Sequence, residues 1–312
     1  MANRTLPRLL QTPAVVLLLL WMLVPLGMTL YFSFIRYVLN SLRRPEWTTP
    51  SISNWRGFGN YEYVLNAKDF WFAIQNSVFI VASILVLTVI LGLAFAMLVN
   101  RSFPGRGIVR VLLISPFFVM PAVNAVLWIN MILDPVLGLN GLAIEAINSM
   151  VSGLRDFPVL GAFFSMWPKI EPVSFRATQT SAYAVIMMVT WQWTPFAVLI
   201  FMTSLQSEDE SQKEAAILDG ANAWSRFRNL TVPHLARPIA IVVMIQSIFH
   251  LSLYAEIEIV SRGNGNKNLP YLIGEFSANN IGAASAAGIF AVILANIVAI
   301  FLLRMVGKSM MD

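Results

Sequence analysis

Six long runs without a charged residue limit what this chain can fold into. Apolar residues make up 57% of its 312 residues, whereas Asp, Glu, Lys and Arg make up only 12%. A soluble domain carries about a quarter charged residues, and about 20 apolar residues suffice for a helix to cross the hydrocarbon of a bilayer. The chain is therefore an integral membrane protein. The runs are Pro13–Ile35, Phe70–Asn100, Val111–Leu133, Ala177–Ser207, Pro238–Ala255 and Phe276–Leu303.

The runs predict helices rather than strands, because backbone groups inside hydrocarbon must pair within their own segment. We therefore expect an all-α membrane protein with six transmembrane helices. Pro25, Pro116, Pro121 and Pro195 lie inside the runs and are expected to kink them. The first run is long enough to span and lacks a small-residue cleavage pattern, so it is interpreted as a retained helix rather than a signal peptide.

The distribution of Lys and Arg predicts the orientation. With the amino terminus inside, the inner segments carry eleven of these residues in 64 positions and the outer segments carry ten in 92. Positive charge is enriched on the cytoplasmic side of membrane proteins. Both termini, the loop 100–110 and the loop 206–237 are therefore expected in the cytoplasm. An apolar segment of the longest outer loop, 159–167, is too short to cross and is expected to lie at the interface or to pack on the protein.

Several classes of function are excluded or disfavoured by the residues that the chain lacks. It has no cysteine, which excludes disulfides and thiolate metal sites. The net charge of +5 is scattered over loops, so nucleic-acid binding is not expected. A phosphate-binding loop needs Gly-x4-Gly-Lys-Ser/Thr, and Leu302 occupies the first glycine position before Gly307. The two histidines predict no metal site, and no catalytic residue is expected.

The polar loop 206–237 between two apolar runs has the sequence pattern of a pair of short helices. Ser207 and Glu210 have the spacing of a capping box, which predicts a helix start at Ser207. Gly220 is suited to end that helix in the left-handed region. A second helix is expected from Asn222 to Leu230, followed by an exit at Pro233. The next membrane helix is expected to open at Pro238.

The same loop carries a signature. Glu214-Ala215-Ala216, Gly220 and Leu230-Thr231-Val232-Pro233 form the pattern E-A-A-x3-G-x9-L-x-V-P. It resembles the EAA signature of the membrane subunits of binding-protein-dependent ABC importers, in which Ile and Leu stand where this chain has Leu230 and Val232. Glu208 to Lys213 departs from the sequence that usually precedes the signature.

The resemblance extends over nearly the whole chain. Gly57–Tyr61, Phe70-Trp71 with Asn76-Ser77, and Trp191–Phe196 match further family patterns. Together they are similar to the carbohydrate branch, whose familiar example is the maltose-type permease, and the tail Gly282–Lys308 is closest to sorbitol- and mannitol-type permeases.

The resemblance implies a function, partners and a domain plan. The chain is expected to have the type I ABC importer permease fold and to translocate a sugar, polyol or small glycoside by alternating access. Residues 1–69 would form an N-terminal helix and outer loop, and 70–312 the core transmembrane domain with the coupling loop 206–237. Implied partners are a second homologous permease, two ATPase subunits that hold ATP and magnesium, and an extracytoplasmic binding protein. The implied location is the bacterial inner membrane.

The resemblance also implies two sets of site residues. The residues that it implies for coupling to the ATPase are Glu214, Ala215, Ala216, Asp219 and Gly220. Substrate binding falls to Gln192, Trp193, Gln246, His250 and Tyr254, whose positions relative to the signature match the sugar site of maltose-type permeases.

The residues themselves allow two interpretations of the second set. Polar groups inside spans usually face a protein interior or a cavity, and Gln246 and His250 share one helix face, which Tyr254 is expected to continue. Hydrogen-bonding groups beside aromatic rings suit a carbohydrate. The competing interpretation is that these groups bond neighbouring helices, as is also expected of Asn124 and Asn296.

Other functional classes stay open at this point. An ion-coupled secondary carbohydrate transporter would need a membrane-buried acid, and the central portions of the six runs contain none. An ABC permease for a non-carbohydrate solute and a membrane scaffold without transport are further alternatives.

Overall fold

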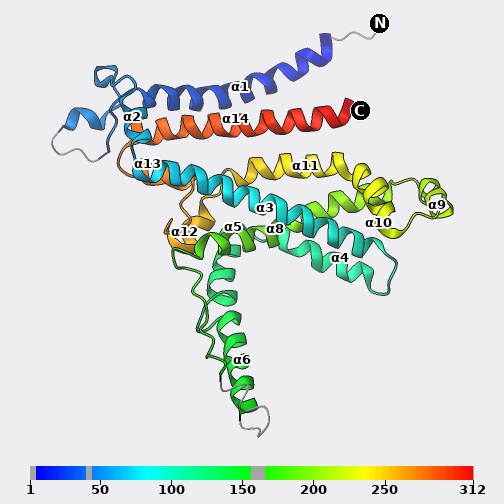
Figure 1. Ribbon diagram of the computed structural model, residues 1–312. Helices are drawn as coiled ribbons and strands as arrows, with labels where there is room; N and C mark the ends of the chain where they lie inside the picture. The colour runs from blue at the N-terminus through cyan, green and yellow to red at the C-terminus, as the bar shows by residue number, and fades with distance from the viewer. Residues whose placement is uncertain (1–4, 40–43, 156–165, 312) are drawn as a thin grey trace. The chain divides into compact units, whose positions relative to one another are not determined.

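The computed structural model describes residues 5–39, 44–155 and 166–311, and helices dominate this part of the chain (Figure 1). Five helices are long and apolar enough to cross a bilayer, and a bent pair raises the number to six if the pair counts as one span. The predicted all-α architecture is confirmed. The segment 159–167, expected at the interface, lies outside the described residues except for its last two.

The long helices cover the predicted runs. α1 continues through Pro25 and α8 through Pro195, so neither proline interrupts its helix. The long helices are α1 (Thr5–Ser33), α3 (Lys68–Asn100), α8 (Ser181–Gln206), α11 (Val232–His250) and α14 (Ile281–Met311).

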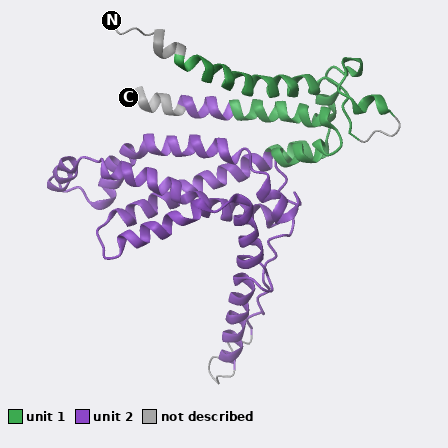
Figure 2. Ribbon diagram, turned by 180° about the vertical axis from the view of Figure 1, so that it is seen from behind, with its two compact units in different colours: residues 1–74, 269–296 green, residues 75–268, 297–312 purple. Residues whose placement is uncertain are grey.

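The chain divides into two compact units, coloured separately in Figure 2. Unit 1 comprises residues 1–74 and 269–296, which include α1, α2 (Gly59–Leu65), α13 (Leu269–Ser277) and most of α14. Two short 3-10 helices, η1 (Pro45–Thr48) and η2 (Ile52–Asn54), lie in its outer loop. Its core is built from Val64, Phe70, Ala73, Leu269, Leu272, Ala283, Ala286 and Ala287.

Small residues at the start of α14 allow close packing within unit 1. A side chain at Gly282 would lie 2.5 Å from the carbonyl oxygen of Ile35 and 2.7 Å from Nδ2 of Asn60. The fully buried Asn60 needs this space because its amide donates to Ser33 O (2.9 Å) and Ile35 O (2.7 Å). It thereby satisfies carbonyls that the end of α1 leaves unpaired.

Unit 2 comprises residues 75–268 and 297–312 and is organised around α8. Most of the apolar window of α8, 61%, is buried inside the structure, the highest share among the described spans. α3, α8 and α11 share a core of Ala96, Ala197, Val198, Phe201, Leu205, Leu235 and Val242. The remaining helices of the unit are α4 (Arg106–Ile114), η3 (Ser115–Phe118), α5 (Pro121–Leu127), the π-helical η4 (Trp128–Ile132), α6 (Leu139–Arg155), α9 (Glu210–Leu218), α10 (Ala223–Arg226), the π-helical η5 (Phe227–Thr231) and α12 (Ala255–Ser261).

The third predicted span is broken rather than kinked. The helical stretches Arg106–Phe118 and Pro121–Ile132 meet at an angle of 104°. Val119 and Met120, both in extended conformation, separate them. Pro116 and Pro121 account for the break, because neither can donate a backbone hydrogen bond across it and Pro121 favours an extended residue before it.

The break leaves backbone groups that must be satisfied inside the bundle, and Gln192 of α8 satisfies one of them. Its Nε2 donates to the carbonyl oxygen of Val119 at 2.5 Å. Its Oε1 accepts from Nδ2 of Asn124, which also donates to Met188 O at 3.1 Å. Both polar ends of Gln192 therefore hold α5 and the break against α8, and the structural role expected of Asn124 is confirmed.

Asn296 corrects another prediction, because among the described residues its amide bonds its own helix and not a neighbouring one. Its Nδ2 donates to Val292 O, one turn earlier in α14, at 2.8 Å. A side chain on an exposed helix face can bond its own backbone without any partner helix.

Gly92 generates a packing prediction. A Cβ built at Gly92 of α3 would lie only 2.6 Å from Cβ of Ala197 in α8. Gly92→Leu should push α3 away from α8 and lower the free energy of unfolding by about 1–3 kcal/mol, measured as thermal unfolding in detergent by tryptophan fluorescence. Gly153→Leu is the matched control, since nothing lies within 4 Å of a Cβ at Gly153. Equal melting temperatures for both variants would contradict the packing described.

Gln192 generates a second prediction. Gln192→Leu should cost about 1–3 kcal/mol of stability, because the carbonyl of Val119 loses its side-chain donor in a buried site. Asn296→Leu removes a comparable amide from an exposed position and should leave the unfolding temperature nearly unchanged. The same fluorescence measurement decides the matter, and a neutral Gln192→Leu would show that the break is held by other contacts.

Candidate functional site

An aromatic cluster lies on α8 and α11 next to the broken span. The Trp193 ring is at its centre, with ring centroids 5.5 Å from Phe117, 5.1 Å from Phe249 and 5.0 Å from His250. Phe196 completes it, 6.0 Å from Trp193 and stacked against Phe117 at 5.9 Å. The Phe249 side chain is 55% exposed, so the cluster borders open space.

Two polar side chains of α11 adjoin the cluster without satisfied hydrogen bonds. Gln246 and His250 are fully or almost fully buried, at 0% and 1% exposure. The Nε2 of Gln246 donates to Trp193 O at 3.3 Å, but its Oε1 has no partner among the described residues. Neither ring nitrogen of His250 has one either. Such groups cost about 1–3 kcal/mol each when left unpaired, so they can gain free energy from a ligand.

The five residues predicted to bind substrate are only partly brought together. Trp193, Gln246 and His250 lie side by side, whereas Gln192 is occupied by Val119 and Asn124. α11 ends at His250, so Tyr254 does not continue its face as expected; it precedes α12 and is 45% exposed. The chain turns there because Leu251 to Leu253 bond back to the last carbonyls of the helix.

Sequence reasoning missed three members of the cluster, Phe117, Phe196 and Phe249. Phe117 points to Trp193 only because the span breaks after Phe118, which a continuous helix does not suggest. Phe249 directly precedes His250, and a helical wheel places adjacent residues about 100° apart. The available signal was the pairing of two prolines, Pro116 and Pro121, which marks a break rather than a kink.

The coupling loop forms a separate candidate site. α9 contains no buried residue, and the side chains of Ile217 and Leu218 are 54% and 88% exposed. Trp224 in the following turn is 67% exposed. Exposed large apolar groups gathered on a polar loop indicate a surface for a partner protein. Figure 1 shows α9 at the tip of the loop that joins α8 to α10.

The signature glycine ends α9 as predicted. Gly220 has φ +78°, its N–H bonds Ile217 O at 3.0 Å, and the N–H of Ala221 bonds Ala216 O at 2.9 Å. These two bonds define a Schellman motif, which needs a left-handed residue at this point. Ala216 is thus held by the cap, while Glu214, Ala215 and Asp219 are exposed.

The predicted helix start at Ser207 is wrong. α9 begins at Glu210, and its N-cap is Asp209, whose Oδ1 accepts from Ser211 N at 2.9 Å. Ser207 instead caps the end of α8, where its hydroxyl donates to Ser204 O at 2.8 Å. Because one hydroxyl cannot cap both the end of α8 and the start of α9, Asp209 takes the second role.

Glu208, in the unusual lead-in to the signature, anchors α9. Its side chain is only 7% exposed; Oε2 lies 3.3 Å from Nζ of Lys213, and Oε1 accepts from the Thr231 hydroxyl at 3.2 Å. A nearly buried carboxylate with two partners connects α9 to the foot of α11, which fixes the direction in which the coupling residues are presented.

The second helix of the loop also differs from the prediction. α10 begins at Asn222, as expected, but η5 carries it directly into α11 without an exit at Pro233. The result is one apolar helical stretch from Ala223 to His250, with Pro238 inside it rather than at its start. Pro233 directly follows the π-helical turn η5, in which Val232 N–H bonds Phe227 O, and the helix continues through it.

Comparisons with known proteins agree with this arrangement. A permease-like relative from Sinorhizobium fredii, named as a probable ABC transporter permease protein y4oQ, is 31% identical over 86% of this chain and 77% of its own length. The trehalose/maltose transport system permease protein MalF of Thermococcus litoralis is 27% identical over 86% and 82%.

A solved structure has the same fold. In a bacterial ABC transporter that imports the acidic polysaccharide alginate, one chain superposes with a TM-score of 0.72 at 20% identity and covers 97% of this chain and 95% of its own. The family model for the inner membrane component of binding-protein-dependent transport systems matches residues 69–312. The chain therefore belongs to that family and has the fold of an ABC importer permease.

Proposed function

We propose that this chain is one of two permease subunits of an ATP-driven importer for a sugar, polyol or small glycoside. The observation that carries the substrate class is the group of unpaired polar atoms on Gln246 and His250 beside the ring of Trp193. The family indicates the transport function, because its members are the inner membrane components of binding-protein-dependent transport systems. Relatives named for trehalose, maltose and lactose transport support a carbohydrate.

The chemistry of the site suits hydroxyl groups. A neutral imidazole offers one donor and one acceptor, and the free Oε1 of Gln246 offers an acceptor. Aromatic rings such as Trp193 and the half-exposed Phe249 present apolar faces to the C–H surface of a sugar. Because the polar atoms are already desolvated, the substrate gains hydrogen bonds at little cost to the protein. Gln192 acts as a positioning residue that keeps the break, and with it Phe117, in place.

The aromatic cluster is open at the exposed Phe249, which suggests how the substrate site is covered during transport. In the proposed complex a second, homologous permease covers this open side, so that the substrate is enclosed between two chains. A binding protein delivers the substrate from outside. Both termini and the coupling loop lie in the cytoplasm, in accord with the charge distribution of the loops.

ATP and magnesium bind to two partner ATPase subunits in this proposal, and the present chain hydrolyses nothing. The coupling residues Glu214, Ala215, Ala216, Asp219 and Gly220 enter a groove on the ATPase. Closure of the ATPase pair then moves α9, and the nearly buried Glu208 passes the movement to the foot of α11. Since α11 is helical from this foot to His250, the movement reaches the substrate groups.

Substrate contact is tested with Gln246→Leu and His250→Phe in the assembled transporter. Each variant removes a polar group that has an unpaired atom, so the fold should keep its stability while substrate transport falls by about tenfold or more, as the loss of one or two hydrogen bonds predicts. The measurement is uptake of a carbohydrate panel into proteoliposomes that contain the binding protein. Asn296→Leu is the control. Unchanged uptake in both variants would remove these side chains from the substrate site.

Coupling is tested with Gly220→Pro and Glu214→Ala. Proline cannot adopt the φ of +78° that ends α9 and cannot donate to Ile217 O. Both variants should insert normally but lose the ATPase stimulation that a substrate-loaded binding protein gives the complex. Glu210→Ala is the matched control, because its carboxylate is 83% exposed and lies outside the signature. If stimulation survives in both coupling variants, α9 does not transmit the ATPase movement.

A further inference from the structure

Two arginines of α4 hold donors that nothing in the described part of the chain satisfies. The Nε of Arg106 and the Nε and one terminal nitrogen of Arg110 are shielded from water and have no hydrogen-bond partner among the described residues. A guanidinium stays charged under all ordinary conditions and presents five donors in a fixed plane. Unpaired and partly buried, this pair is costly unless an anion binds to it.

The exposed apolar side chains of α4 indicate what surrounds the helix. Ile108, Val111 and Leu112 are 69%, 69% and 65% exposed, whereas Arg106 and Arg110 are half-buried. A soluble surface helix has the reverse arrangement, with its apolar face inward. This surface of α4 is suited to hydrocarbon, and a lipid headgroup is an anion that such a surface would meet.

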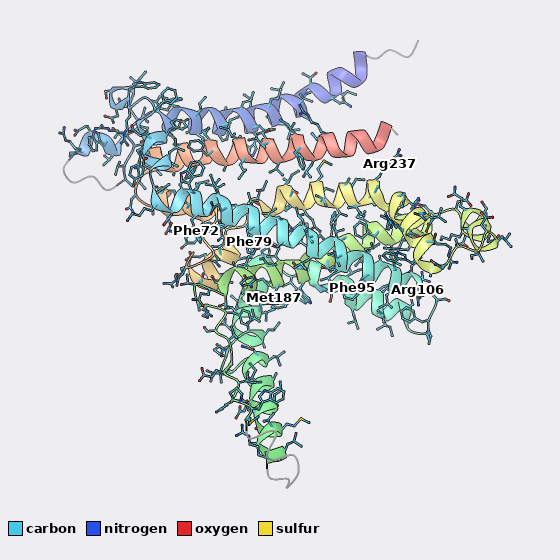
Figure 3. The ribbon with its side chains drawn as sticks, in the orientation of Figure 1. Phe72, Phe79, Phe95, Arg106, Met187 and Arg237 are labelled. Atoms are coloured by element: carbon cyan, nitrogen blue, oxygen red, sulfur yellow. The ribbon has the colours of Figure 1, made fainter. Side chains whose placement is uncertain are left out.

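An apolar groove runs alongside α4, and its lining includes residues one helical turn from the arginines. It has a volume of about 630 Å³ and is lined by residues of α3, α4 and α8, among them Leu91, Phe95, Val109, Leu113 and Met187. Val109 and Leu113 each lie three residues after an arginine, so Arg106 and Arg110 stand at the head of the groove on the same helix side. Figure 3 shows Arg106, Phe95 and Met187 following one another along unit 2.

We infer that this groove binds one anionic phospholipid, with its phosphate on Arg106 and Arg110 and an acyl chain along the groove. Arginine pairs with phosphate through short, charge-assisted hydrogen bonds, and basic pockets between membrane helices are suited to anionic headgroups. The lipid belongs to the leaflet next to the loop 100–110, which is cytoplasmic in the proposed orientation. The site lies apart from the aromatic cluster, because the groove is lined by Thr190, Trp191 and Thr194 of α8 rather than by Trp193.

The experiment uses the assembled transporter purified in a neutral detergent and titrated with dioleoylphosphatidylglycerol. Native mass spectrometry should show one tightly retained phosphatidylglycerol for each copy of this chain in the complex. Arg106→Gln with Arg110→Gln should lower its apparent affinity at least tenfold. Leu91→Trp, which fills the groove and keeps both charges, should weaken it as well. Arg228→Gln, which removes an exposed loop charge, should bind as the wild type does.

Three results would overturn the inference. One is equal retention of the lipid by the double arginine variant. Another is binding of a control compound as tight as that of phosphatidylglycerol. Equal binding of soluble glycerol phosphate would show that the groove contributes nothing, and equal binding of dioleoylphosphatidylcholine would show that the negative charge contributes nothing. The third is a protein occupant: the chain has no cysteine, so Leu112→Cys carries a unique thiol, and its crosslinking to a helix of the partner permease would assign the groove to that partner. Unchanged melting temperature in lipid-free detergent verifies that the variants fold.

Discussion

The requirement that polar groups be paired inside hydrocarbon governs this structure. The sharpest case is the break between Phe118 and Pro121, where extended backbone lies in the middle of a span. Such backbone is tolerated only when protein groups cover it. Gln192 does so by bonding Val119 O and Asn124 at once. The break in turn directs Phe117 onto Trp193, so the aromatic cluster exists because one glutamine holds an irregular segment in place.

Among the buried polar groups that lack a partner in the described residues, two pairs adjoin a candidate ligand site. Gln246 and His250 are buried more completely than Gln192, yet they keep unpaired atoms. Arg106 and Arg110 do the same at the other end of the bundle. A stable interior gives no reason to retain such groups. One pair adjoins aromatic rings and suits a neutral, hydroxyl-rich ligand, whereas the other heads an apolar groove and suits an anionic amphiphile.

The sequence allowed the helices and the signature to be predicted more reliably than the way they are joined. Charge-free runs locate spans because the bilayer fixes their length, and Gly220 ends α9 as its type suggests. The break after Phe118, the N-cap at Asp209 and the continuous path through Pro233 were not foreseen, since each depends on competition between neighbouring caps and prolines. For the same reason, periodicity predicted that Gln246 and His250 share a face but placed Tyr254 wrongly, beyond the end of α11.

Glu208, in the unusual segment before the signature, connects α9 to the foot of α11. In many helix–loop–helix arrangements a polar loop can swing independently of the membrane helix that follows it. Here a carboxylate that is 7% exposed ties Lys213 of α9 to Thr231 at the foot of α11. Removing one partner from such a site leaves an unpaired, nearly buried charge, which is far more costly than losing a surface ion pair. Glu208 therefore ties α9 to the helical stretch from Ala223 to His250, which carries Gln246 and His250.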